Sequence, residues 1–375
     1  MNKVIYFDNA ATSFPKPKRV YNKLMKCVGS YLGNPGRSSH KLSVRAAEEI
    51  FSAREEIASL LNVNSPECVV FTYNATHAIN LAIKSFISED CHVLTSDFEH
   101  NSVIRPLERL VETNQIRYSC FDSDGDIASN ISAKRRPETK GIICSIASNV
   151  TGAKIPLKLL SDYAQDNNLF LIIDASQAIG HTEINLNDTP CDVLCAPGHK
   201  SLFGIQGCGF AYFKDNVRKN GIMEGGSGTD SINPFMPALL PEGYEAGTPP
   251  TPAIVTLSEG TKYVKKIGIE EISTKLFTLT NRAWEVLSSF PSVIIYKSEN
   301  GILSFNIDKI SSSYIAAELD KYGICVRGGL HCAPSIHKKL GTLGQGAVRL
   351  SFSYLNDLNE IDVFYKAIKE IISKK

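Results

Sequence analysis

Asp174 and Lys200 are the residues whose types and positions first suggest chemistry. Asp174 ends the strongly apolar run LFLIID, and Lys200 lies in APGHK, directly after another short apolar run. Either residue alone is more typical of an ordinary loop. Together they match what pyridoxal 5'-phosphate (PLP) requires, which is a lysine that holds its aldehyde as a Schiff base and a carboxylate that keeps its pyridine nitrogen protonated. The pair therefore predicts a PLP site.

The segment NATHAIN, residues 74–80, is a candidate for holding a phosphate group. It joins a predicted strand to a predicted helix, and the N-terminus of a helix offers free N–H groups and the positive end of the helix dipole. Thr76 would add a hydroxyl donor to the phosphate site, although this threonine could equally be an ordinary helix cap. The sequence has no Walker A motif and no GxGxxG between a strand and a helix, which disfavours nucleotide-binding classes.

Three further polar residues follow predicted strands. His100, in DFEHNS, could stack on a cofactor ring and move protons near neutral pH, but a surface histidine is the alternative. Asn149 follows SIAS and could donate to a phenolate-like oxygen, and Gln177 comes three residues after Asp174. We expect all three near the cofactor.

Cys332 is the one cysteine of ten that lies in a polar, glycine-rich neighbourhood, VRGGLHCAP. Arg327 and His331 would supply positive charge, which favours the reactive thiolate, and the two glycines allow close approach of the backbone. Arg349 is a charged residue in the apolar run AVRLSFS. It either faces the surface or clamps a carboxylate.

The elements that must position these residues alternate between strand and helix, which predicts a mostly parallel sheet with helices on both faces. Ligands of such sheets bind at the carboxyl ends of the strands. Residues 207–213 leave little room for a helix before them, so we expect an antiparallel strand there. We expect strands over 67–73, 91–96, 141–148, 169–174, 191–196, 207–213, 302–308, 324–329 and 347–353. We expect helices over 42–61, 75–87, 103–112, 156–167, from 253 onward, 314–323 and 359–373, and no regular structure over 221–252.

Composition excludes several classes of protein. The chain has 375 residues, a formal net charge of +1 and 43% hydrophobic residues, which argues against disorder and against a protein built mainly to bind nucleic acid. It has no CxxC zinc pattern, no apolar signal-peptide core and no apolar run long enough for a transmembrane helix. We expect a cytoplasmic protein with reduced thiols, no metal site and no membrane or nucleic-acid partner.

The ordered set of motifs resembles the cysteine desulfurases of the class V aminotransferase, fold-type I PLP-dependent superfamily. The motifs run from residue 6 to about residue 348 and are DNAAT, NPGRSSH, ATHAIN, EHNS, SNVTG, DASQA, GHK, EAGTP, RGGLHCA and VRLSF. RGGLHCAP is similar to the group II branch, which includes selenocysteine-lyase-like enzymes. The resemblance implies an α/β fold with a large domain over 15–252, built on a mostly parallel seven-stranded sheet between helices. It also implies a small α+β domain from 1–14 and 253–375, which carries the catalytic cysteine.

The resemblance also implies a role for each candidate residue. Lys200 would form the Schiff base, Asp174 would pair with the pyridine nitrogen, and His100 would stack on the ring and shuttle protons. Cys332 would be the nucleophile that receives sulfur. Ala75, Thr76 and His199 would hold the phosphate, Asn149 and Gln177 would contact the phenolic oxygen, Arg349 with Asn149 would bind the substrate, and Thr248 would reach the phosphate of a neighbouring subunit in a homodimer.

The activity implied is conversion of L-cysteine to L-alanine, which leaves a persulfide on Cys332 for a dedicated acceptor protein. The alternatives are a selenocysteine lyase or a cystine or cysteine C–S lyase of the same fold, and a PLP-fold scaffold that has lost catalysis. Pro197 stands two residues before His199, where the family often has a hydroxyl residue, and Gly328, Gly329 and Leu330 replace a more polar stretch before His331.

Overall fold

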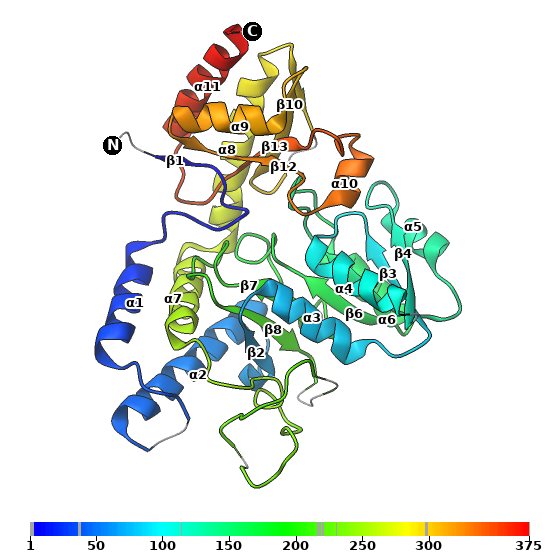
Figure 1. Cartoon of the computed structure of the whole chain (residues 1–375), viewed down its shortest axis with the longest axis vertical. Coiled ribbons are helices and arrows are strands. Elements are labelled where there is room, and N and C mark those ends of the chain that lie inside the picture. The colour runs from blue at the N-terminus through cyan, green and yellow to red at the C-terminus, as the bar shows by residue number, and fades with distance from the viewer. Residues whose placement is uncertain are drawn as a thin grey trace.

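The computed structural model describes residues 4–36, 39–113, 115–215, 219, 221–229, 231–296 and 299–374. Arg37 and Ser38 of the NPGRSSH motif and Asp230 of the segment 221–252 lie outside these residues. Figure 1 shows two sheets, one in the lower part of the view and a smaller one above it, joined by the long helical segment of α7 and α8.

The larger sheet has seven strands in the order β2-β8-β7-β6-β5-β3-β4. Neighbouring strands are parallel except β8, which is antiparallel to both β2 and β7. The predicted parallel sheet and its antiparallel strand are therefore confirmed. The strands are β2 (Val69–Thr72), β3 (Cys91–Ser96), β4 (Ile116–Phe121), β5 (Thr139–Ser145), β6 (Phe170–Asp174), β7 (Val193–Pro197) and β8 (Gly209–Phe213).

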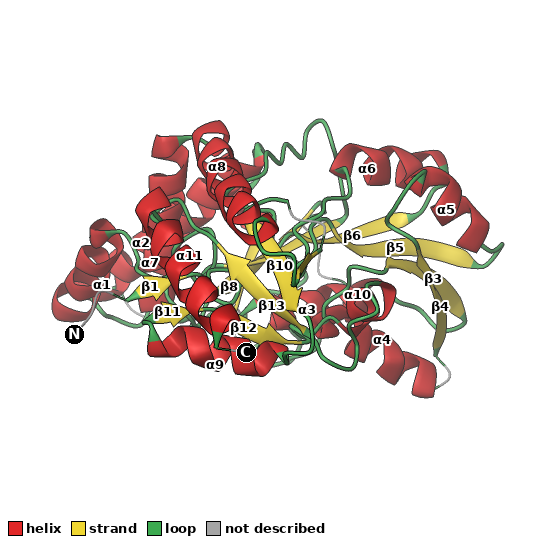
Figure 2. Cartoon of the chain, turned by 90° about the horizontal axis from the view of Figure 1, so that it is seen from above, coloured by secondary structure: helices red, strands yellow, loops and turns green. Residues whose placement is uncertain are grey.

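Helices cover both faces of this sheet because its central strands are apolar on both sides. In β6, Leu171 and Ile173 belong to one buried cluster while Ile172 belongs to another, as the alternation of side chains across a strand requires. Figure 2 shows α5 (Ile127–Lys134) and α6 (Leu157–Asp166) on one side of the sheet, with α3 (Ala75–Phe86) and α4 (Asn101–Glu112) on the other.

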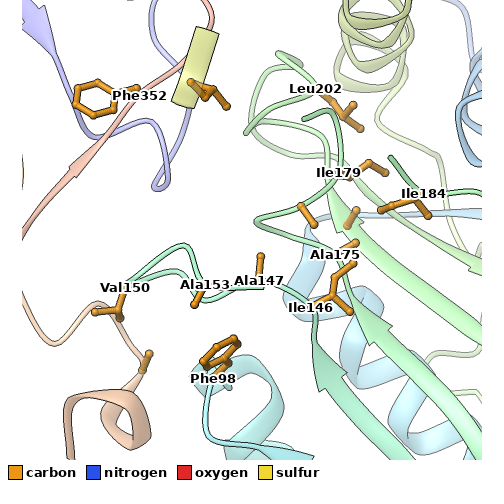
Figure 3. Packing of buried hydrophobic residues seen from close by; sticks show 14 of the residues in the cluster. Phe98, Ile146, Ala147, Val150, Ala153, Ala175, Ile179, Ile184, Leu202 and Phe352 are labelled. Atoms are coloured by element: carbon orange, nitrogen blue, oxygen red, sulfur yellow. The ribbon is translucent and has the colours of Figure 1, made fainter. Parts of the chain in front are cut away.

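The larger of the two clusters continues past the carboxyl ends of the strands. Figure 3 shows part of it, where the loop after β5 carries Ile146 next to Ala175 and Ala147 towards Phe98. The same cluster includes Phe305 and Phe364 from the smaller sheet and its helix. One continuous apolar core therefore joins the two sheets and fixes the polar residues at their junction.

The smaller sheet is antiparallel, with the order β12-β13-β10-β9, and β1 pairs in parallel with β11 to form a separate two-stranded ladder. Helix α7 packs against α1 and α2 beside the larger sheet, and α8 packs against α11 and the smaller sheet. These elements are α1 (Lys18–Ser30), α2 (Lys41–Leu61), α7 (Thr251–Ile267), α8 (Ile269–Ser288), α9 (Ser312–Lys321), α10 (Pro334–Lys339), α11 (Leu358–Ser373), β1 (Ile5–Tyr6), β9 (Val293–Ile295), β10 (Ile302–Ile307), β11 (Ile324–Cys325), β12 (Arg327–Gly329) and β13 (Ala347–Ser351).

Most expected elements are present with ends shifted by a few residues. The strand expected from residue 67 begins at Val69, because Pro66–Cys68 form a 3₁₀ turn. Within the described part of 221–252, no helix or strand forms before Thr251, as expected. None of the helices in the described ranges has both the length and the apolar character that a membrane span requires.

Candidate active site

A cavity of about 210 Å³ lies at the carboxyl ends of the large-sheet strands, next to the smaller sheet. It brings together most of the predicted site residues. Those that line it are Ala75, Thr76, His100, Asn149, Asp174, Gln177, His199, Lys200 and Arg349. The prediction that these residues share one site agrees with this cavity, and their individual roles stay predictions.

Lys200 and Asp174 lie in this cavity because β6 and β7 are adjacent and parallel, so that both strands end at the same edge. The Asp174 carboxylate accepts a hydrogen bond from the Ser176 N–H at 2.9 Å, which fixes its orientation. Burial lowers the pKa of Lys200 to about 8, against the opposing effect of Asp174. The lowered pKa makes the neutral form of this amine more accessible near physiological pH than in an exposed lysine, and only a neutral amine can attack a carbonyl carbon.

Residues of the N-terminal segment form hydrogen bonds to the backbone at Lys200. The carbonyl of His199 accepts from the Ser13 N–H at 3.1 Å and from Lys16 Nζ at 2.8 Å, and the carbonyl of Lys200 accepts from Ser13 Oγ at 2.8 Å. Lys16 is buried, and burial lowers the pKa of its amine to about 7. The position of Lys200 is thus set from a segment almost two hundred residues away in the sequence.

The first turn of α3 forms the end of the cavity suited to a phosphate. Asn74 caps the helix by accepting the His77 N–H at 2.9 Å, and Ala75 and Thr76 line the cavity. Gly209 of β8 packs directly beneath this turn, where a Cβ atom would lie 2.7 Å from the carbonyl carbon of Asn74. A helix N-terminus of this kind binds anions through its free N–H groups.

His100 occupies the N-cap of α4, and its ring faces the cavity. Its Nδ1 accepts the Ser102 N–H at 3.1 Å. Because an amide N–H can only donate, the neutral ring carries its proton on Nε2. Burial lowers the pKa of His100, although Asp174 acts in the opposite direction.

Arg349 is fully buried in the cavity wall, so of the two expectations for this residue the surface-facing one is wrong. Its Nη2 lies 2.7 Å from Asp8 Oδ1, and its Nη1 donates to the carbonyl of Asn149 at 2.9 Å. The Asn149 side chain donates to the carbonyl of His331 at 2.7 Å, and Gln177 Nε2 donates to the carbonyl of Ala10 at 2.9 Å. Both side-chain amides are therefore held in place by the protein backbone.

Three buried polar atoms of these residues have no partner in the described part of the chain: Asn149 Oδ1, His199 Nδ1 and Arg349 Nε. Buried polar groups are normally hydrogen-bonded, so unpaired ones in a cavity wall indicate a polar ligand. Their placement, beside the lysine Lys200, a carboxylate at a strand end and a helix N-terminus, fits PLP.

Cys332 lies in the loop between β12 and α10 and is exposed. It does not line the cavity, but its neighbour His331 does. The carbonyl of Cys332 accepts the N–H of Asn101, the first residue of α4, at 2.8 Å. The expectation that His331 supplies positive charge is wrong, because burial, with the nearby Arg349, lowers the pKa of His331 to about 2 and keeps its ring neutral.

Thr248 is not in the cavity of its own chain. It lies in a separate hollow with Tyr73 and His77, on a segment anchored by Glu245. The Glu245 carboxylate pairs with both terminal nitrogens of Arg54, at 2.8 and 2.5 Å.

Sequence reasoning missed several residues of the site. Asp8 pairs with Arg349, and its signal was its position in DNAAT, two residues after β1. Glu99 is fully buried beside His100 and accepts hydrogen bonds from Ser145 N and Oγ. Nothing in the sequence around Lys16 indicated a role in the site, because a single lysine between two prolines is typical of a surface residue.

Comparison with known proteins agrees with this geometry. Residues 5–364 match the family model described as Aminotransferase class-V. A probable cysteine desulfurase of Methanothermobacter thermautotrophicus is 31% identical over 98% of this chain and 94% of its own length. A probable cysteine desulfurase of Pyrococcus abyssi is 29% identical over 99% of this chain and 94% of its own length.

Solved structures show the same architecture. The apo structure of a cysteine desulfurase from Thermococcus onnurineus NA1 has a TM-score of 0.92 and 29% identity, covering 100% of this chain and 96% of that one. The S-sulfonic acid form of CsdA from Escherichia coli has a TM-score of 0.90 at 22% identity, covering 99% and 95% of the two chains, which supports the fold alone.

Proposed function

This chain belongs to the class-V aminotransferase family, and on that premise we propose that it is a PLP-dependent cysteine desulfurase that converts L-cysteine to L-alanine. Sulfur would be left as a persulfide on Cys332 for transfer to an acceptor. Relatives that align over nearly their whole length carry this name, which supports the proposal.

The observation that carries the proposal is that the cavity of Lys200 and Asp174 is in contact with the loop of Cys332. Lys200 and Asp174 share one cavity, and the loop of Cys332 is packed against the edge of that cavity. Two hydrogen bonds make this contact, from Asn149 to the carbonyl of His331 and from Asn101 to the carbonyl of Cys332. A thiol on a loop at the edge of a cavity that holds a Schiff-base lysine has no role in simple amino transfer, but it is what an acceptor of substrate sulfur requires.

Bound PLP would supply an electron sink that stabilises negative charge at the substrate α-carbon. Ala75, Thr76 and His199 would hold its phosphate, Asp174 its pyridine nitrogen, and Gln177 and Asn149 its phenolic oxygen. Lys200, with its lowered pKa, would provide the neutral amine that holds the aldehyde.

The remaining residues act on the substrate. Arg349 would bind the substrate carboxylate through its unpaired Nε, and His100 would move a proton at Nε2. The Cys332 thiolate would attack the substrate sulfur, so that the Cβ–S bond breaks, the S–S bond of a persulfide forms, and Cβ takes a proton to give alanine.

Several finer predictions accompany this function. A homodimer would place Thr248 at the partner's phosphate site, and a separate protein would accept the sulfur. The division into a domain over 15–252 and one over 1–14 and 253–375 stays a prediction, as does a cytoplasmic location.

The test is release of alanine and sulfide from L-cysteine by PLP-loaded protein in the presence of reductant. We expect wild type and Cys120→Ala, which removes another exposed cysteine, to be active and Cys332→Ala to be inactive. Lys200→Ala should be inactive on every amino acid. Cysteine turnover that survives in Cys332→Ala would overturn the assignment of this residue. An inactive wild type that cleaves selenocysteine or cystine would favour those substrates instead.

A further inference from the structure

A chain of buried side chains lies behind the Cys332 loop, and nothing in the proposed reaction uses it. His331 Nε2 lies 3.2 Å from the carbonyl of Arg327, and His331 Nδ1 lies 3.2 Å from Nε2 of His337. His337 Nδ1 lies 2.8 Å from the hydroxyl of Thr342. The two imidazole rings are stacked at 23°, with centroids 5.4 Å apart, and all three side chains are buried.

The carbonyl of Arg327 fixes the direction of the other hydrogen bonds in this series of side chains. A carbonyl can only accept, so His331 carries its proton on Nε2 and presents a bare Nδ1. His337 must then donate from Nε2, which leaves its Nδ1 bare to accept from the Thr342 hydroxyl. Every position is satisfied when both rings are neutral. Burial lowers the pKa values of both histidines, which agrees with this arrangement.

This assignment leaves His331 without a free ring nitrogen for acid–base chemistry. Both of its ring nitrogens are committed, although its ring lines the cavity and it precedes the proposed nucleophile. What the chain of hydrogen bonds can do is fix the loop.

The loop needs such support because it is strained. His331 and Cys332 both have left-handed backbone conformations, with φ of 52° and 57°, which residues with a Cβ atom rarely adopt. Such a conformation persists only where its surroundings determine it. The His331 ring is tied to His337 on α10, and the His331 carbonyl is tied to Asn149 in the loop after β5.

We propose that His337 is a positioning residue that holds Cys332 and Asn149 in their reactive geometry. It acts through its hydrogen bond to His331, and Thr342 is the last member of the hydrogen-bonded series. The proposal rests on the proposed desulfurase function. Its effect should fall on the step that needs the Cys332 thiol and spare the steps that need only the Lys200 cavity.

The test compares two substrates in PLP-loaded holoenzyme. L-Cysteine requires attack by Cys332. β-Chloro-L-alanine loses chloride from its β-carbon without an attacking thiol and, with water, yields pyruvate and ammonium. His337→Phe keeps the stacked ring and removes both hydrogen bonds. We expect it to lower kcat on L-cysteine by about 10- to 100-fold, as misplacement of a reacting group does. Elimination from β-chloro-L-alanine should stay within about threefold of wild type, a change too small to reflect a displaced reacting group.

Two variants complete the set. His337→Gln retains a donor at the position of Nε2 and should restore most of the cysteine activity. Lys338→Ala alters the exposed neighbour on α10 and should leave both reactions unchanged. Equal loss on both substrates in His337→Phe, or no loss on either, would overturn the proposal.

Amide hydrogen exchange over 312–342 gives a second readout that needs no turnover. His337→Phe should exchange faster than wild type in the loop 330–333, while the amides of α9 stay unchanged. If wild type proves inactive on L-cysteine, the desulfurase function fails, and this exchange decides the positioning role alone. Unchanged protection of 330–333 in His337→Phe would contradict it.

Discussion

At the scale of single residues, the site depends on buried charges that are held by very few partners. Arg349 is fully buried, and within the described ranges its ion pair is with the carboxylate of Asp8, at 2.7 Å. Removing one member of a buried pair leaves the other charge uncompensated, which costs far more than the pair itself contributes. Asp8 therefore determines where the Arg349 guanidinium lies.

The first prediction is that Asp8→Asn will weaken substrate binding. We expect KM for L-cysteine to rise about tenfold because the guanidinium is displaced, with a smaller change in kcat. The free energy of unfolding should fall by about 3 kcal/mol, the lower end for a broken buried pair. Steady-state kinetics and urea unfolding measure both quantities.

The matched control is Asp162→Asn, which breaks an exposed pair with Lys158 on α6 and should alter neither quantity. A stability loss in Asp8→Asn with an unchanged KM would show that the Asp8–Arg349 pair serves folding alone.

Glu99 gives a prediction about pH. Burial raises its pKa to about 7 from an ordinary value of 4.5, although hydrogen bonds from Ser96 and Ser145 act in the opposite direction. Between these two pH values the folded protein holds a proton that the unfolded chain has lost. The contribution of Glu99 to stability therefore falls as pH rises from 4.5 to about 7 and is constant above that.

Glu99→Gln removes this titration. The stability of the variant relative to wild type should increase by about 3 kcal/mol from pH 4.5 to pH 7, since each pKa unit corresponds to about 1.4 kcal/mol. Urea unfolding of both proteins across this range measures the difference. A difference that is constant with pH would mean that the carboxyl of Glu99 ionises normally in the folded protein.

The sequence was informative about residues at the ends of apolar strands. Asp174, Lys200, His100 and Asn149 were all found in this way, because strand periodicity and the rule for parallel sheets place them at one edge. Asp8 and Lys16 were not found. Their importance depends on contacts with residues far away in the chain, which local patterns do not reveal.

At the scale of elements, Lys339 adds an ionic contact between the Cys332 segment and the larger sheet. Lys339, the last residue of α10, lies 2.7 Å from each of three carboxylates: those of Asp97, Asp122 and Asp124. These aspartates are in the loops that follow β3 and β4. The cluster holds the helix after Cys332 against the edge of the larger sheet.

The prediction from this cluster concerns salt. Lys339→Met should lower the thermal stability of the protein at low ionic strength, because three carboxylates then repel one another without a cation. Salt screens partly exposed charges. The difference in unfolding temperature between variant and wild type should therefore become smaller from low salt to about 1 M, where the Debye length is only about 3 Å. Thermal unfolding at the two salt concentrations measures this. Lys338→Met is the control, and a difference that does not depend on salt would rule out an electrostatic role for Lys339.

Helices and strands with a regular spacing of apolar residues were predicted well, and those without such a pattern were missed. The strand 91–96 has the expected bounds, whereas β4 was overlooked because it lies at the edge of the sheet and its middle residues are partly exposed. Helix α1 was overlooked because only Val20 and Cys27 of its residues are buried. Its stability comes from packing on α7, which is distant in sequence.

At the scale of the whole molecule, the cavity exists only where the two sheets meet. Lys200 and Asp174 come from the larger sheet, Arg349 comes from the smaller one, and Asp8 follows the N-terminal strand. Family resemblance predicted this assembly, because its motifs are spread along the whole chain. Thr248 lies outside the cavity of its own chain, and its role in a partner subunit stays a prediction.

The central claim is that substrate sulfur is transferred to Cys332. The most direct measurement is mass spectrometry of the peptide that contains Cys332, after PLP-loaded protein is mixed with one equivalent of L-cysteine without reductant. The claim predicts one additional sulfur atom on Cys332, with alanine formed in equal amount and no sulfur on Cys120. Alanine formation with an unmodified Cys332, or with sulfur on another cysteine, would contradict it.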